Sequence, residues 1–88
     1  MNTLPTIKLN GVDYFIDHRL KEFRMCNNPH RFFSFDILKD EGDFYIIKFI
    51  KGTDNKIAGD GMYEYGSLIE CEIPAFALHP QKSKQTFN

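Results

Sequence analysis

The stretch GVDYFIDHRLKEFRMCNNPHR, residues 11–31, decides the predicted fold. Its first residue, Gly11, follows Asn10, and this Asn-Gly pair has alternating apolar residues on both sides, at positions 6–9 and 12–16. Asn-Gly tolerates the two positive φ angles of a type I′ turn, which joins antiparallel strands tightly. The sequence therefore predicts a β-hairpin in which Leu9 lies opposite Val12 and Ile7 lies opposite Tyr14.

The alternation within this hairpin separates two faces. One face carries only apolar side chains or tyrosine: Ile7, Leu9, Val12, Tyr14 and Ile16. The other face is mixed, with Lys8, Asp13, Phe15 and Asp17. One apolar and one mixed face is typical of an antiparallel pair that lies on a core.

After the hairpin, the sequence predicts a short helix near residues 17–26. Asp17 has the side chain of a helix N-cap, because its carboxylate can accept hydrogen bonds from the first unpaired backbone N–H groups. Leu20 and Phe23 are three residues apart and would face inward together. The proline at position 29 disfavours the α conformation at Asn28 and limits the helix on that side.

Two segments of this stretch support a resemblance. The string Y-F-I-D-x-R-L-K-E-F-R at residues 14–24, followed by N-N-P-H at residues 27–30, resembles a group of small uncharacterised proteins of bacteria, archaea and their viruses and plasmids. The resemblance implies a mobile-element or microbial cytoplasmic context. It assigns no catalytic residue.

The rest of the chain is predicted to form strands. Phe33, Phe35 and Ile37 alternate with their neighbours, and residues 39–43 form a polar turn. Residues 44–51 (FYIIKFIK) are the strongest strand signal, and their apolar character on both faces predicts a central strand.

The C-terminal third contains two further predicted strand regions. Residues 56–58 begin a strand that bends or bulges at Gly59-Asp60-Gly61 and resumes at residues 62–65. A final strand at residues 68–73 points Ile69, Cys71 and Ile73 inward, and Ala75–Leu78 packs on the core after it.

These elements predict a mainly β fold. We expect a small, bent antiparallel sheet or partly open barrel of about six strands joined by hairpins, with the one short helix near 17–26. A two-layer α+β arrangement is the alternative. We expect residues 1–78 to form a single small domain, and residues 79–88, which lose the apolar pattern, to form a flexible tail.

Charge narrows the function classes. The chain has 11 Lys and Arg against 12 Asp and Glu, for a net charge of −1, unlike the strongly basic balance of duplex-DNA binders. Residues 18–31 are nevertheless basic, because only Glu22 opposes their arginines, lysine and histidines. No apolar run approaches the roughly 20 residues of a membrane span, so we expect a cytoplasmic protein with no membrane contact.

Catalytic and metal sites are not favoured by the residue spacing. His18, Cys26 and His30 match none of the usual zinc patterns, so we predict no metal and no cofactor. A Cys26/His30 nucleophile pair would need Arg24 and Arg31 to stabilise the thiolate. A small Cys/His-dependent enzyme is therefore the less favoured alternative, and the chain is predicted not to be an enzyme.

The predicted function is a non-enzymatic module that binds a protein partner, such as an inhibitor or regulator. Its contact surface would contain five basic residues, with Phe32 or Phe33 as an apolar anchor: His18, Arg19, Lys21, Arg24 and Arg31. An internal salt bridge from one arginine to Asp17 or Asp36 is an equal alternative for that residue. A small β-barrel that binds single-stranded nucleic acid through Phe15, Phe32 and Phe33 is the main rival, and self-association is a further possibility.

Overall fold

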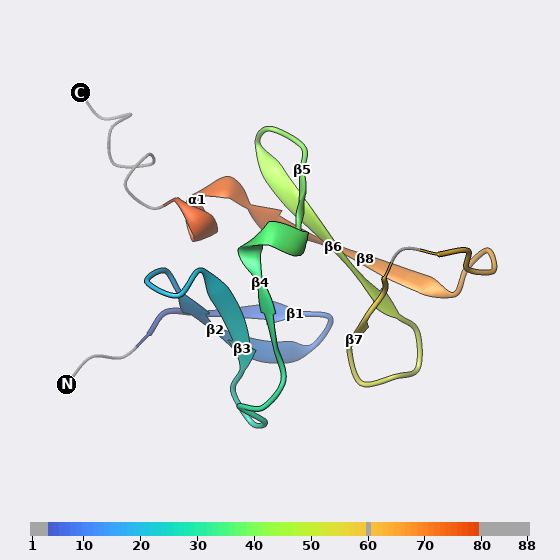
Figure 1. Ribbon diagram of the computed structural model, residues 1–88, viewed down its shortest axis with the longest axis horizontal. Coiled ribbons are helices and arrows are strands. Elements are labelled where there is room, and N and C mark those ends of the chain that lie inside the picture. Colours follow the sequence, from blue (N-terminus) through green and yellow to red (C-terminus); the bar gives the residue numbers. More distant parts are fainter. Residues whose placement is uncertain (1–3, 60, 80–88) are drawn as a thin grey trace.

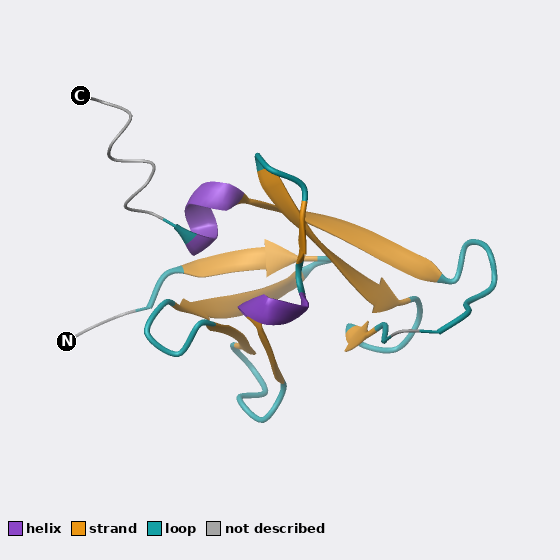
Figure 2. Ribbon diagram, turned by 45° about the horizontal axis from the view of Figure 1, so that its top comes forward, coloured by secondary structure: helices purple, strands orange, loops and turns teal. Residues whose placement is uncertain are grey.

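The fold consists of two four-stranded antiparallel sheets and one short helix, in a computed structural model that describes residues 4–59 and 61–79 (Figures 1 and 2). Sheet A has the order β1 (Thr6–Leu9), β2 (Val12–Asp17), β3 (Glu22–Met25), β4 (Phe32–Ser34). Sheet B contains β5 (Lys39–Asp40), β6 (Phe44–Ile50), β7 (Lys56–Ile57) and β8 (Leu68–Pro74). The two sheets do not close into a barrel, and the predicted mainly β fold is confirmed.

Strand β6 is the centre of sheet B, as its sequence predicts. All seven of its residues pair with β8 along one side. Its other side is shared, since β5 pairs with Tyr45 and Ile46 and β7 pairs with Phe49 and Ile50. A gap between β5 and β7 therefore lies along the middle of β6.

The first hairpin has the predicted turn and register. Asn10 and Gly11 have φ angles of 50° and 79°, the two left-handed residues that a type I′ turn requires. Leu9 pairs with Val12 and Ile7 with Tyr14. The predicted inner face lies on the core, with Leu9, Tyr14 and Ile16 buried.

The predicted helix near residues 17–26 is wrong. Asp17 accepts hydrogen bonds from the backbone N–H groups of Arg19 and Leu20, at 3.0 and 2.9 Å, but it caps a tight turn that leads into strand β3. Lys21 has a left-handed φ of 56°, which no α-helix accommodates. Phe23 is buried whereas Leu20 is 55% exposed, so the predicted inward pair does not form.

Three strand boundaries also differ from the prediction. Phe35–Ile37 is a 3₁₀ turn, because the Ser34 hydroxyl accepts a hydrogen bond from the Asp36 backbone N–H and draws the chain out of the strand. Lys39 and Asp40, predicted in a turn, form β5. Residues 62–65 belong to a loop, with Met62 and Tyr65 fully exposed; Asp60 of the predicted bend lies outside the described residues.

Aromatic rings from both sheets form the core. The ring centroids of Tyr14 and Phe49 lie 6.5 Å apart, and Phe33 lies 5.0 Å from Phe23 and 6.3 Å from Phe49. The other buried apolar residues complete one cluster: Leu9, Ile16, Met25, Leu38, Ile47, Ile73, Ala77 and Leu78. Sheet A therefore packs on sheet B through a single aromatic-rich core.

One buried polar residue also links the two sheets. The Asn55 side chain donates to the Leu9 carbonyl at 3.0 Å and to the Tyr14 hydroxyl at 3.1 Å. It also accepts a hydrogen bond from the Asn10 side chain at 2.8 Å. The β6–β7 turn is thereby attached to the β1–β2 hairpin with every polar atom of the Asn55 side chain engaged.

Helix α1 (Ala75–Leu78) follows β8, and Ala77 and Leu78 are buried, as predicted. A His18 ring nitrogen lies 2.7 Å from the Ala77 carbonyl oxygen, which joins α1 to sheet A. The His79 ring lies 2.9 Å from the Tyr45 hydroxyl. Residues 80–88 of the predicted tail lie outside the described residues.

Candidate functional site

A row of two phenylalanines and one arginine crosses the outward face of sheet A. Phe15 on β2 pairs with Arg24 on β3, and Arg24 pairs with Phe32 on β4. Their neighbours Tyr14, Phe23 and Phe33 are buried, and successive side chains of a strand point to opposite faces. Phe15, Arg24 and Phe32, named the aromatic row below, therefore lie together on the solvent side.

Arg24 is held in place by three contacts. Its guanidinium carbon lies 4.5 Å from the centroid of the Phe32 ring, within the range of a cation–π interaction. One guanidinium nitrogen forms an ion pair with Glu22, and another donates to the Pro29 carbonyl at 2.5 Å. The row thus has a fixed centre, while the Phe32 side chain remains 53% exposed.

Arg24 forms an internal salt bridge, which was the predicted alternative for one of the arginines. Arg24 does pair with a carboxylate of its own chain, but the partner is Glu22 and not the predicted Asp17 or Asp36. Glu22 and Arg24 are two residues apart on one strand, so both side chains point to the same face of sheet A. In a helix, by contrast, residues two apart would point in nearly opposite directions.

The remaining basic residues do not form one surface. Arg19 and Lys21 lie in the turn before β3, while Arg31 comes after the turn that follows β3. Four residues of extended chain span roughly 13 Å, so β3 separates the two groups. Arg31 forms an ion pair with Asp54 at 3.4 Å, across to the β6–β7 turn.

Two of the predicted surface residues lie elsewhere. Phe33 is only 5% exposed and packs against Tyr14, so it is not a surface anchor. The His18 ring contacts Phe35 and the Ala77 carbonyl, where it joins sheet A to α1. Of the predicted set, Arg24 and Phe32 lie in direct contact, with Arg31 next to them in the chain.

Acidic side chains surround the aromatic row. The outward face of sheet A carries the cations Lys8 and Arg24 and three carboxylates, on Asp13, Asp17 and Glu22. Lys8 lies 3.5 Å from Asp13, and Glu22 neutralises Arg24. The face has no excess of positive charge, so a phosphate backbone gains little electrostatic attraction from it.

The surroundings of Cys26 disfavour the thiolate that a Cys26/His30 nucleophile pair would need. Desolvation, together with the carboxylate of Asp13, raises the pKa of the Cys26 thiol above its usual value. A catalytic cysteine requires the opposite shift. Among the described residues, no three His, Cys, Asp or Glu side chains gather in a way that would hold a metal ion.

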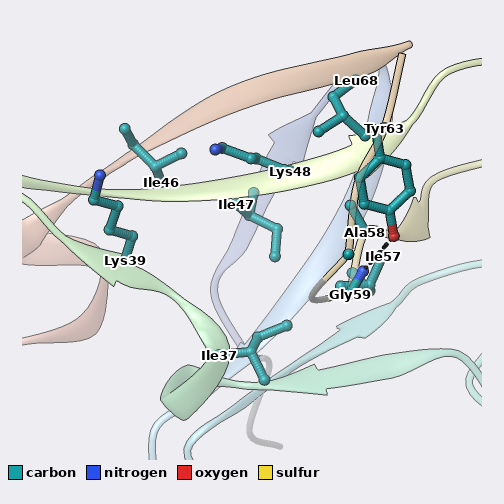
Figure 3. Close-up of a pocket in the computed structure, with 11 residues that line it drawn as sticks. Ile37, Lys39, Ile46, Ile47, Lys48, Ile57, Ala58, Gly59, Tyr63 and Leu68 are labelled. Carbon is teal, nitrogen blue, oxygen red and sulfur yellow. Dashed lines mark hydrogen bonds between the residues drawn. The ribbon is translucent and has the colours of Figure 1, made fainter. Parts of the chain in front are cut away.

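An open hollow of about 650 Å³ lies beside β6, in the gap between β5 and β7 (Figure 3). Its walls mix apolar side chains with polar groups, and Tyr63 reaches it from the loop after β7, where the hydroxyl accepts a hydrogen bond from the Gly59 N–H at 2.9 Å. Lys39 and Lys48 also line it, 3.1 Å from Glu41 and 3.7 Å from Glu70 respectively. Its described lining contains no histidine, cysteine or carboxylate that would pair with the lysines in acid–base chemistry.

No feature of the sequence predicts this hollow. Its lining comes from strands, the 3₁₀ turn and the loop after β7, which no short motif connects. The sequence predicts part of the aromatic row, since Phe15 and Phe32 are expected to be exposed in the alternative that binds single-stranded nucleic acid. Their alignment with Arg24 was missed because it depends on β3 being a strand.

Comparison with protein-family models, with curated proteins and with solved structures gives no match for this chain. Within the described residues, no helix is both long enough and apolar enough to cross a membrane.

Proposed function

We propose that this chain is a non-enzymatic protein-binding module whose contact surface is centred on the aromatic row. The observation that carries the proposal is the exposed Phe32 ring stacked on an arginine that two other contacts hold in place. Arginine and aromatic residues are enriched at interface hot spots. A side chain that is already ordered loses less conformational entropy when a partner binds.

The charge around the row favours a protein over single-stranded nucleic acid. Stacking platforms for nucleic acid combine aromatic rings with cations that contact phosphates. Here Arg24 and Arg31 are each paired with a carboxylate. The other charged residues on the outward face of sheet A are Asp13, Asp17 and Lys8, and Lys8 lies opposite Asp13. A protein partner with an apolar patch and mixed charge fits this surface better.

The proposal includes a cellular setting. The resemblance of residues 14–24 and 27–30 supports an inhibitor or regulator in a microbial cytoplasm, carried by a mobile genetic element. It does not identify the host protein that the module meets.

The test compares two exposed phenylalanines. Phe32 and Phe76 are 53% and 61% exposed, but Phe76 lies on α1 and is not part of the aromatic row. After capture from a nuclease-treated host lysate, the captured protein is purified and its affinity for both variants is measured by calorimetry. We expect Phe32→Ala to weaken binding by roughly thirtyfold, the size of an interface hot spot, and Phe76→Ala to leave it unchanged.

Two results would contradict the proposal. Equal affinities of the Phe32→Ala variant and the wild type would show that the aromatic row is not the contact surface. Capture that disappears on nuclease treatment would favour the nucleic-acid alternative. Circular dichroism melting of both variants checks that neither substitution unfolds the chain.

A further inference from the structure

Among the described residues, strand β8 is paired along one edge only. The Lys51 N–H donates to Ser67 at 2.8 Å and the Ala75 N–H donates to Asp43 at 3.2 Å, at the two ends of the β6–β8 ladder. Hydrogen-bonded pairs alternate along an antiparallel ladder. The backbone groups of Ile69, Cys71 and Ile73 therefore point at β6, and those of Leu68, Glu70 and Glu72 point away from it.

In the part of the chain that the structure describes, nothing pairs with this second edge. Strand β8 pairs with β6 alone, and no other backbone hydrogen bond involves Leu68, Glu70 or Glu72. Figure 2 shows β8 running along the margin of the molecule, from the long loop before it back to α1. At seven residues, β8 is as long as the central strand β6.

The inner side of β8 is also incompletely covered. Ile73 is fully buried, but Ile69 and Cys71, which face the core from the same strand, are only half-buried. An additional strand at this edge would cover both side chains. A strand that adds to the edge of a sheet buries apolar side chains that were partly exposed there.

The outer side of β8 determines what such a strand would carry. Glu70 and Glu72 are both exposed and lie two residues apart, so they point to the same face. Lys48 lies 3.7 Å from Glu70, and no ion pair of Glu72 is formed among the described residues. A strand added at this edge would place its own side chains directly opposite these two carboxylates.

A second copy of the chain is disfavoured at this edge. Antiparallel pairing of two β8 strands through Leu68, Glu70 and Glu72 places a glutamate opposite a glutamate in every register that uses all three residues. Like charges directly opposite each other destabilise a sheet. The two carboxylates therefore select against self-pairing.

We propose that the outer edge of β8 binds an extended segment of a partner protein in which basic and apolar residues alternate. The segment adds a strand to sheet B through the backbone groups of Leu68, Glu70 and Glu72. Its basic residues lie opposite Glu70 and Glu72, and its apolar residues cover Ile69 and Cys71. This surface is separate from the aromatic row and does not depend on it.

The experiment uses the full chain labelled with ¹⁵N and synthetic peptides. An acetylated, amidated peptide that alternates lysine and valine is compared with one that alternates glutamate and valine. We expect the lysine peptide alone to shift the amide signals of Leu68, Glu70 and Glu72 and to slow their hydrogen exchange. A version N-methylated at its lysines, whose N–H groups would face Leu68, Glu70 and Glu72, cannot complete the ladder and should lose this effect.

Charge reversal tests the selectivity. Glu72→Lys should weaken the lysine peptide by about tenfold and make the glutamate peptide bind, because a favourable cross-strand pair becomes a repulsive one. Glu64→Lys changes the net charge equally in the exposed loop before β8 and should alter neither peptide. Phe32→Ala should also leave both peptides unaffected, so failure of one surface does not imply failure of the other.

Three outcomes would overturn the proposal. The first is the absence of amide shifts at Leu68, Glu70 and Glu72 at millimolar lysine peptide. The second is equal binding of the N-methylated peptide, since that binding would not use the strand backbone. The third is an equal loss of affinity in Glu72→Lys and Glu64→Lys, which would show only a general response to net charge.

Discussion

The β1–β2 and β2–β3 hairpins share strand β2, yet only the first was predictable. The first turns at Asn10 and Gly11, with φ angles of 50° and 79°. The second turns through residues 18–21, where Asp17 caps the turn and Lys21 takes a φ of 56°. Asn-Gly marks the first turn because it tolerates the two positive φ angles of a type I′ turn, whereas residues 18–21 contain neither glycine nor asparagine.

The apolar spacing of the second hairpin is also ambiguous. Leu20 and Phe23 fit a helical spacing of three, while Phe23 and Met25 fit the strand spacing of two. The structure follows the strand pattern, burying Phe23 and Met25 and leaving Leu20 exposed. Pairing with the second edge of β2 favours this choice, because the backbone of β3 then gains partners in β2 and β4, and its Met25 N–H donates to the Arg31 carbonyl just before β4.

The largest expected effect separates the two interpretations of this segment. Met25→Ala removes a side chain that is 3% exposed and should cost about 2–5 kcal/mol of unfolding free energy. Leu20→Ala changes a side chain that is 55% exposed and should stay within about 0.5 kcal/mol. Urea denaturation of both variants measures the difference. A larger loss of unfolding free energy for Leu20→Ala than for Met25→Ala would favour the helical interpretation.

The first hairpin gives the next largest effect. Gly11→Val places a β-branched side chain at a φ of 79° and should cost about 1–3 kcal/mol, although no atom would clash with the added Cβ. Gly11→Asn is the control, because asparagine adopts the left-handed region more readily than valine. Equal thermal midpoints for the two variants would mean that backbone conformation does not set the stability of this turn.

The same contrast explains how much of the molecule the sequence could predict. Strands β1, β2, β6 and β8 were predictable because each has a clear alternation or a strongly β-forming composition. The role of Asn55 was not, because its partners Leu9, Asn10 and Tyr14 lie more than 40 residues away in the chain. A polar residue in a turn usually faces solvent, and only the packing of the two sheets makes this one buried.

The candidate site shows the same limit. Composition identified Arg24 and Phe32, and it also selected Phe33, because adjacent phenylalanines look alike until the strand phase is known. With Phe23 and Met25 fixed inward, β3 pairs Arg24 with Phe32 and Phe23 with Phe33. The wrong helix prediction therefore also led to a wrong predicted surface. It grouped basic residues that β3 separates, and it did not reveal the aromatic row, which forms only when β3 is a strand.

The smallest expected effect is also the one whose sign differs between the two interpretations. Lys21 is exposed, and its φ of 56° lies in the region that costs an L-residue roughly 1 kcal/mol or more. Lys21→Gly removes that strain and should raise the unfolding free energy by up to about 1 kcal/mol relative to Lys21→Ala, which keeps the Cβ. Within a helix the same comparison would run the other way, since glycine there is about 1 kcal/mol worse than alanine. Both variants lose the lysine charge, so the difference between their urea midpoints reports backbone conformation alone. A glycine variant less stable than the alanine variant would show that residues 18–21 do not form this turn.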